Sequence, residues 1–358
     1  MPSLKEIKGR INSISSTLAI TSAMKMVAAA KLQKAQMAIQ NMLPYERRLH
    51  SMLIDLMGAM NISAAASEDG SVRGSGSAER GFDQSGDRLS LSNRHDLAGM
   101  DGAYSLMAQR EVRKVAIVAF ASNSSLCGAF NSNAIREATA VINEYRASGL
   151  GDADITVYSV GRKMAEAMKK LGFPSPADFT KMSDSPSYDA ASALAQELFD
   201  GFVSGRFDKV ELVYNHYKST SSQPTTRQTY LPLSLADATA DLQAGKITDS
   251  ASETGTNKVA EPVGAPVVRQ GSPTTEDLIV EPSKEALIAT LLPKVIRLRV
   301  FTTLLDSAAA EHAARTVAMQ LATDNGNDLL QELTLEYNKG RQQKITSEIL
   351  DLVGGSMQ

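Results

Sequence analysis

The sequence is poor in the residues that form disulfides, metal centres and aromatic-rich cores. Its single cysteine, Cys127, excludes an intrachain disulfide and any cysteine-rich metal site. There is no tryptophan and only 5% aromatic residues, whereas fifteen methionines and many alanines suit long helices. No apolar run approaches the roughly 18 residues that a membrane-spanning helix needs. The net charge of −3 gives no sign of a bulk nucleic-acid binder.

The motifs of common catalytic and nucleotide-binding sites are also missing. There is no GxxxxGK[ST] phosphate loop, and the run GSGSAERG follows no strand and has the wrong glycine spacing for a dinucleotide site. The four histidines are scattered, and no acid–base pair or zinc spacing is recognisable (His50, His95, His216, His312). Cys127 has no neighbouring histidine to activate it, so we interpret it as a structural thiol. By exclusion, the chain is expected to be a mechanical or interaction protein.

Two long amphipathic helices are predicted at the two ends of the chain. From Glu311 to Val353, apolar residues recur every three or four positions, which predicts one apolar stripe on a helix (Val317, Leu321, Leu330, Leu333, Tyr337, Ile345, Ile349, Leu352). These residues would form a rod of roughly 65 Å at 1.5 Å per residue. A rod of that length needs a partner helix of similar length to bury its stripe.

The N-terminal residues supply that partner. Ser3 and Glu6 form a capping box, and a heptad seam follows immediately (Leu4, Ile7, Ile11, Ile14, Leu18). We expect the seam to slip near Thr21 and to resume later (Ala28, Leu32, Ala35, Ile39, Met42), and Pro44 to kink or interrupt the helix before it continues to about residue 60. The sequence therefore predicts that a long helix within residues 1–60 pairs with a long helix within residues 284–358.

Between the terminal helices, strands alternate with helices. Strands are predicted at 115–120, 155–160, 209–215 and 226–233, with helices at 134–145, 161–171 and 190–203. This order predicts a Rossmann-like α/β domain with a mostly parallel sheet over residues 112–235. The loop containing Gly128 follows the first strand, where such folds bind ligands, but one glycine without convergent charge is a weak signal. A short last strand is predicted within 278–283.

Two stretches rich in small and polar residues, 61–111 and 236–277, are predicted to be flexible insertions joined to the α/β domain. We weigh two interpretations for them: surface loops without a further role, or loops with a regulatory role. Neither contains a cysteine, which excludes a disulfide switch.

Several segments resemble the gamma subunit of the F-type rotary ATP synthases. ITSAMKMVAAAKL (20–32) is similar to that family's first helix, and SLCGAFN (125–131) is similar to its loop after the first strand, although Asn123, Ser124 and Ser125 depart from the usual DRG. YNHYKSTSSQPTTRQTYLPL (214–233) resembles its late strand pair, and residues 311–349 resemble its C-terminal signature. The resemblance covers both ends and the middle of the chain and skips the two insertions.

The resemblance implies a rotor. In that family the terminal helices form an antiparallel coiled coil, which is the central shaft. The shaft lies inside a ring of alpha and beta subunits, which bind ATP, ADP and magnesium. The α/β domain forms a foot that binds the epsilon subunit and the membrane c-ring. Proton flow turns the c-ring and the shaft, and the shaft biases each beta subunit differently at each angle. The family implies one copy per complex, no cofactor and no catalytic site on this chain, and a peripheral position on the cytoplasmic face of a bacterial inner membrane.

The resemblance also implies particular contacts. Met24 and Lys25 would face the acidic lever loop of the beta subunit, and Arg341, Gln342 and Thr346 would meet its catch loop. The shaft seam would comprise ten positions (Leu4, Ile7, Ile11, Ile14, Leu18, Leu330, Leu333, Tyr337, Ile345, Ile349). Three residues in one loop are placed near the c-ring or epsilon subunit (Lys218, Ser219, Gln223). For Arg341, the competing interpretation is an ordinary solvated helix charge.

Two other classes of function stay open at this point. The chain could be an α/β enzyme that acts on a nucleotide, which nucleotide binding by the isolated chain would favour. It could instead be a coiled-coil adaptor or scaffold without a rotary role. Homodimerisation through the terminal helices would favour the adaptor, because the two helices of a shaft pair within one chain.

Overall fold

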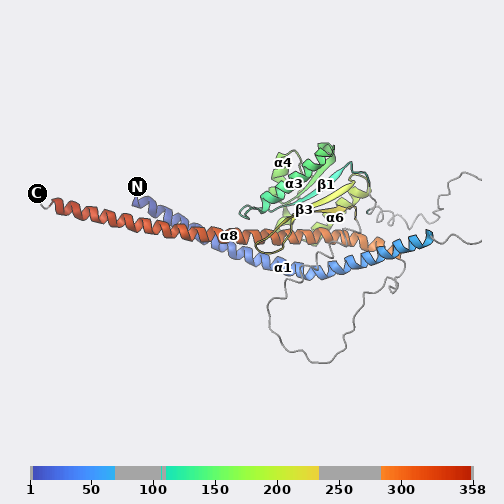
Figure 1. The fold of residues 1–358 in the computed structure, drawn as a ribbon, viewed down its shortest axis with the longest axis horizontal. Coiled ribbons are helices and arrows are strands. Elements are labelled where there is room, and N and C mark those ends of the chain that lie inside the picture. Colours follow the sequence, from blue (N-terminus) through green and yellow to red (C-terminus); the bar gives the residue numbers. More distant parts are fainter. Residues whose placement is uncertain (1–2, 69–105, 107–109, 234–283, 356–358) are drawn as a thin grey trace, which may run out of the picture.

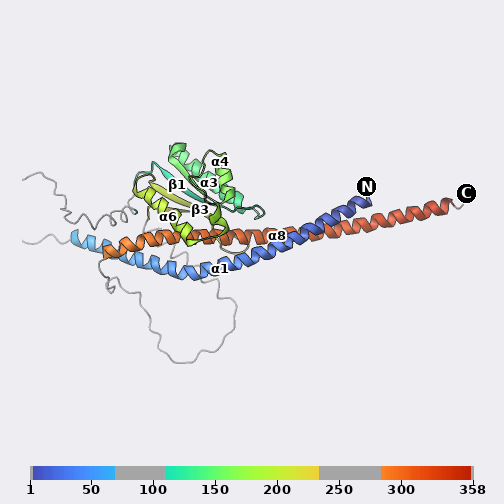
Figure 2. The ribbon, with the colours of Figure 1, turned by 180° about the vertical axis from the view of Figure 1, so that it is seen from behind.

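The computed structural model describes residues 3–68, 106, 110–233 and 284–355. Two long helices, α1 (Leu4–Glu68) and α8 (Lys284–Gly355), lie side by side and antiparallel, and the α/β domain sits against one side of them (Figures 1 and 2). Both chain ends lie at the same end of this shaft, and the C-terminal helix extends beyond the start of α1. The predicted antiparallel coiled coil is confirmed.

The helix α1 is longer and less interrupted than the sequence suggested. The Ser3 hydroxyl accepts a hydrogen bond from the Glu6 amide at 3.3 Å, as the capping box predicts. The helix then passes Pro44 without a break and ends at Glu68 rather than near residue 60. Pro44 removes one backbone donor but leaves the flanking turns bonded, so packing against α8 holds the helix through it. Figure 1 shows α1 bent along its length rather than split in two.

The foot contains a four-stranded sheet in the order β2–β1–β3–β4. Its strands are β1 (Val115–Phe120), β2 (Ile155–Val160), β3 (Lys209–Asn215) and β4 (Thr225–Leu231). β1 is parallel to β2 and β3, whereas β4 is antiparallel to β3. The first three strands match their predicted bounds, and the mostly parallel sheet is confirmed. The predicted last strand within 278–283 lies outside the described residues.

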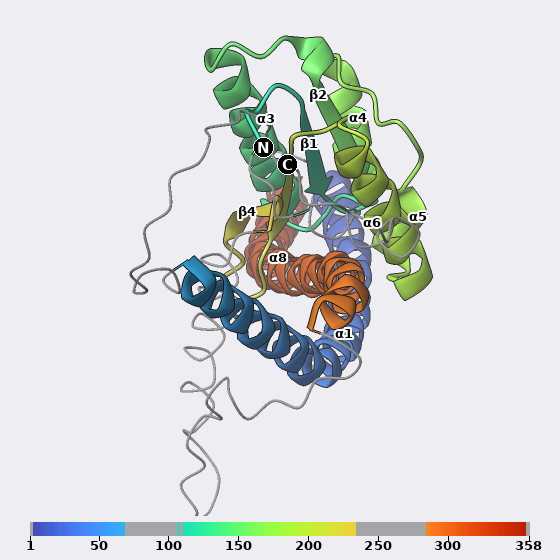
Figure 3. The ribbon, with the colours of Figure 1, turned by 90° about the vertical axis from the view of Figure 1, so that its right-hand side faces the viewer.

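Helices cover both faces of the sheet. Successive side chains of β1 point to opposite faces of the sheet. On one face, Val115 and Ile117 pack under α3 (Phe130–Ala147) and α4 (Arg162–Lys170). Val118 and Phe120 face α6 (Tyr188–Val203) and α8 on the other side. A short helix, α5 (Thr180–Asp184), which the sequence analysis missed, and the 3-10 turn Asp152–Asp154 complete the foot. Figure 3 looks along the shaft and shows these layers stacked on its side.

The foot and the shaft share one hydrophobic core. Leu49, Leu53 and Leu56 of α1 join residues of α8 such as Leu292 and the sheet's own apolar side chains in a single buried cluster. Leu106 belongs to the same cluster and is fully buried, although residues 61–111 were predicted to be a flexible insertion. An apolar side chain near the end of that stretch therefore packs into the foot. Residues 69–105 and 234–283 lie outside the described residues.

Candidate functional site: the shaft and its junction with the foot

The two shaft helices keep one register where residues 4–21 of α1 face residues 323–340 of α8. An added Cβ at Gly326 would lie 2.7 Å from Leu18, and one at Gly340 would lie 3.1 Å from Leu4. The Thr323 hydroxyl donates to that of Thr21 at 3.1 Å. In all three pairs the residue numbers add up to 344. A constant sum is the mark of an antiparallel pair without slippage, and it places Ile11 opposite Leu333 and Ile14 opposite Leu330.

This register corrects one expectation and supports another. The seam does not slip at Thr21, because a polar threonine pair occupies the heptad position there. Five of the predicted seam residues on α1 and three on α8 are buried or half-buried (Leu4, Ile7, Ile11, Ile14, Leu18, Leu330, Leu333, Tyr337). The helix also continues through Gly326 despite the turn-like sequence TDNG, because a close approach of Leu18 needs a residue without a side chain there.

The last turns of α8 have no partner helix among the described residues. Ile345 is 48% exposed and Ile349 is 55% exposed, so their predicted place in the seam is wrong. The reason is length: α1 begins at Leu4, opposite Gly340, and α8 runs on alone to Gly355. This single helix is about 22 Å long. It carries a cluster of exposed apolar side chains, which we call the tip (Ile345, Ile349, Leu350, Leu352, Val353).

The residues predicted to contact a beta subunit lie at two heights of the shaft. Met24 and Lys25 are half-buried on α1, and Lys25 stands at a heptad position opposite Met319 by the same register. Their neighbours Met26 and Val27 are the more exposed side chains, at 65% and 57%. Arg341, Gln342 and Thr346 are exposed on the unpaired end of α8. The two groups are separated by about 33 Å along the helix axis.

The loop after β1 fastens the foot to α8. The Arg315 guanidinium donates to the Ser124 hydroxyl at 2.7 Å and lies 2.8 Å from the Glu311 carboxylate. Burial raises the pKa of Glu311 even though Arg315 lies beside it. The pKa of the next residue, His312, falls to about 4 because of burial and the nearby positive charges of Arg315 and Lys31. His312 is therefore a neutral side chain between cations.

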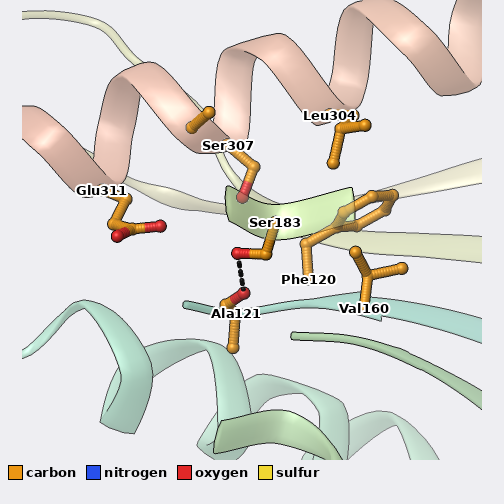
Figure 4. A pocket seen from close by; sticks show the side chains of 8 residues that line it. Phe120, Ala121, Val160, Ser183, Leu304, Ser307 and Glu311 are labelled. Atoms are coloured by element: carbon orange, nitrogen blue, oxygen red, sulfur yellow. Dashed lines mark hydrogen bonds between the residues drawn. The ribbon is translucent and has the colours of Figure 1, made fainter. Parts of the chain in front are cut away.

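A small cavity lies where α8 crosses the carboxyl ends of β1 and β2. Figure 4 shows Glu311 and Ser307 of α8 pointing toward Ser183 of α5, whose hydroxyl donates to the Ala121 carbonyl at 3.0 Å. The cavity has a volume of about 10 Å³, which is room for about one water molecule. The place where α/β folds bind ligands is thus filled by the chain's own C-terminal helix.

The loop after β3 reaches both shaft helices. Asp306 of α8 accepts a hydrogen bond from the Tyr217 amide at 2.9 Å and lies 2.6 Å from the Nδ1 atom of His216. The hydrogen bond to Asp306 raises the pKa of His216 above its usual value. The Tyr217 hydroxyl accepts a hydrogen bond from the Gln36 amide of α1 at 2.6 Å. One loop of the foot therefore holds on to α8 and α1 together.

This loop also contains the residues expected near a c-ring or epsilon subunit. Lys218 and Ser219 are exposed, and Gln223 is half-buried with its amide bonded to the Ser219 and Thr220 carbonyls. The loop lies at the carboxyl edge of the sheet. From Lys284 toward the tip, α8 first meets the other end of the strands, where the Tyr230 hydroxyl donates to the Ile296 carbonyl. Ten residues later it meets the loop after β3 at Asp306. These residues therefore face the tip side of the foot.

The residues that join the foot to the shaft were not predicted from the sequence. Asp306, Arg315 and Gln36 were not singled out, and Tyr217 was quoted only within a motif. One signal was available: the run AAAEHAA of α8 places small residues on successive turns, which favours close approach of another element. Which element approaches depends on the tertiary fold, and periodicity along one helix cannot specify it.

The possible metal ligands of the described residues are dispersed. Within residues 3–68, 106, 110–233 and 284–355, no group of three or more histidine, cysteine, aspartate or glutamate side chains could hold a metal ion. Cys127 is buried beside Phe130 and Ala310, in keeping with a structural thiol. None of the described helices is both long and apolar enough to span a membrane.

Comparisons with known proteins point to one family. The ATP synthase family matches residues 3–357. The ATP synthase gamma chain of Phocaeicola vulgatus is 47% identical over 357 residues, and that of Bacteroides thetaiotaomicron is 45% identical over 358 residues; each comparison covers all of both chains. A chain of the OSCP/F1/c-ring structure of Euglena gracilis mitochondrial ATP synthase has the same fold, with a TM-score of 0.52, 19% identity, and coverage of 99% of this chain and 93% of that one. The chain therefore belongs to the family of ATP synthase gamma chains.

Proposed function

We propose that this chain is the rotor shaft of an ATP synthase, which couples rotation of a membrane c-ring to conformational change in a ring of alpha and beta subunits. The observation that carries the proposal is the shaft itself. A coiled coil within one chain ends in a single helix whose apolar tip residues are exposed (Ile345, Ile349, Leu350, Leu352, Val353). Exposed apolar patches of this kind mark partner sites. An apolar sleeve formed by the alpha and beta subunits would cover the tip.

In this proposal the chain is a non-catalytic subunit. ATP, ADP and magnesium are bound by partner subunits, and the shaft acts by presenting different sides to three identical beta subunits. Arg341, Gln342 and Thr346 are available for a catch loop because they are exposed on the unpaired helix. At the contact nearer the foot, the acidic lever loop of a beta subunit would meet Lys25 together with the more exposed Met26 and Val27.

The geometry of the foot argues against a c-ring contact at the loop after β3, which the resemblance implied. If the tip enters the alpha and beta ring, the membrane c-ring lies beyond the opposite end of the shaft. Lys218, Ser219 and Gln223 lie on the tip side of the foot, so we propose that they face the alpha and beta subunits rather than the c-ring. The epsilon subunit and c-ring are then expected nearer the other edge of the sheet, close to Lys114 and Asp208.

Co-purification from native membranes tests the proposal. A tagged chain should be recovered as one copy with three alpha and three beta subunits, at the cytoplasmic face of the membrane, with ATPase activity in the complex and none in the isolated chain. Truncation after Gly340 should weaken this association, because it removes the tip and leaves the coiled coil complete. Recovery of the chain alone or as a homodimer would refute the rotor assignment.

A further inference from the structure

We propose that Tyr217 is a positioning residue that keys the foot to both helices of the shaft, and that this key carries torque between them; the inference rests on the proposed rotor function. Tyr217 lies two residues after the end of β3, so the sheet positions its backbone, and its side chain contacts residues of α1 and α8. One residue of this loop is thus hydrogen-bonded to both helices.

The packing of the ring is the first argument. The Tyr217 side chain packs against a buried cluster of Leu32 of α1 with Ala309 and Ala313 of α8, and against a second cluster that includes Ala310 of α8 and Cys127 and Phe130 of the foot. Alanine at these positions leaves the space that an aromatic ring needs between two helices. A larger side chain there would displace the ring, because close-packed interiors hold few voids.

The polar contacts are the second argument. Asp306 of α8 accepts a hydrogen bond from the Tyr217 amide at 2.9 Å and fixes the backbone of the loop. Gln36 of α1 donates to the Tyr217 hydroxyl at 2.6 Å and fixes the far end of the ring. The residue is therefore held at its base by one helix and at its end by the other.

The lever arm is the third argument. A contact on α8 alone resists twisting of the foot about that helix only weakly, since the force acts close to the axis. Packed helices are about 8–10 Å apart, so a bond to α1 acts at a distance of that order from the α8 axis. The apolar cluster around Leu49 and Leu53 grips α1 at the other edge of the foot. Tyr217 supplies the matching grip at the tip-side edge.

The test uses the whole ATP synthase in inverted membrane vesicles and measures ATP-driven proton pumping per ATP hydrolysed. Tyr217→Phe removes only the hydroxyl and keeps the ring, and Gln36→Leu removes the same hydrogen bond from the other side. Each should lower the pumping-to-hydrolysis ratio by up to about fivefold. That is the change in an equilibrium constant that corresponds to the net free energy of about one hydrogen bond. The double variant should fall no further, because both changes remove one bond.

Ser221→Ala, at the exposed end of the same loop, is the matched control and should keep the wild-type ratio. Tyr217→Ala should lower the ratio further than Tyr217→Phe, because the ring is lost as well. A wild-type ratio in both Tyr217→Phe and Gln36→Leu would overturn the key, even if Tyr217→Ala does not assemble. Failure of the proposed function is a separate result: the chain would then not co-purify with alpha and beta subunits in the wild type.

Discussion

The close approach of Gly326 and Leu18 allows a sharp test of the shaft register. An alanine Cβ at position 326 would lie 2.7 Å from Leu18 Cδ2 and 3.2 Å from its Cγ. Carbon atoms in good contact are about 3.5–4.0 Å apart, so Leu18 must move out of its packing position. Overpacking of this kind costs about 1–3 kcal/mol, whereas replacing glycine by alanine inside a helix stabilises by about 1 kcal/mol. We expect Gly326→Ala to change the free energy of unfolding by between zero and about −2 kcal/mol.

The matched control is on the other helix. Gly9 is exposed on α1, and an added Cβ there meets no atom within 4 Å. Gly9→Ala should therefore stabilise by the full helix-propensity gain of about 1 kcal/mol. Chemical denaturation followed by circular dichroism would give the overall change, and amide hydrogen exchange around residues 18 and 326 would give the local one.

A second background makes the test independent of the absolute values. When Leu18 is first replaced by alanine, the obstacle to a side chain at position 326 is gone. Gly326→Ala should then stabilise, so the sign of its effect reverses between the two backgrounds. If Gly326→Ala stabilises to the same extent in both backgrounds and as much as Gly9→Ala, Gly326 does not face Leu18 and the register described above is wrong.

Three further predictions concern the foot. Glu211 is 1% exposed, and burial alone would raise its pKa, but hydrogen bonds from Arg227 and other partners lower the pKa instead. The Glu211 carboxylate therefore stabilises the fold above its unfolded pKa, and this stabilisation is lost as the pH falls. Arg227→Met should cost about 2–4 kcal/mol of unfolding free energy and reduce this acid dependence, as denaturation series at several pH values would show. Asp306 raises the pKa of His216, and Lys218 opposes this effect. The His216–Asp306 pair therefore stabilises the fold below the unfolded pKa near 6.5, and this stabilisation is lost as the pH rises through the higher folded pKa. Asp306→Asn should remove this loss of stability on the alkaline side, and an unchanged loss would contradict the pairing. Cys127 is 1% exposed, so a thiol reagent should label it at the rate of unfolding rather than at the rate of an exposed thiol, as mass spectrometry over time would show.

Much of the fold could be predicted from the sequence because its signals are local. The strands 115–120, 155–160 and 209–215 are short apolar runs bounded by polar residues, and their limits were predicted correctly. The heptads of Leu4 to Leu18 likewise predicted the seam and the pairing of the two chain ends. The strands and the apolar face of the first helix are decided by residues a few positions apart in the sequence.

The remaining features depend on where a partner helix starts and stops. Ile345 and Ile349 continue the apolar periodicity of α8, but α1 has no residues left to cover them. Thr21 breaks the apolar pattern but keeps the register, because its partner is another threonine 302 residues along the chain. Tyr217 looks like an ordinary loop residue until the sheet places it between the helices. Periodicity shows which face of a helix is buried, and only the tertiary structure shows what buries it.

The pairing of Leu4 with Gly340 has a consequence for how the protein is made. The two residues lie at nearly opposite ends of the chain, so the N-terminal helix leaves the ribosome long before its partner exists. At translation rates of about 5–20 residues per second, the gap is roughly 17–67 s. During that time the apolar seam of the first helix is open to water and to other nascent chains. We expect the nascent N-terminal helix to need chaperones until synthesis of the chain is almost complete.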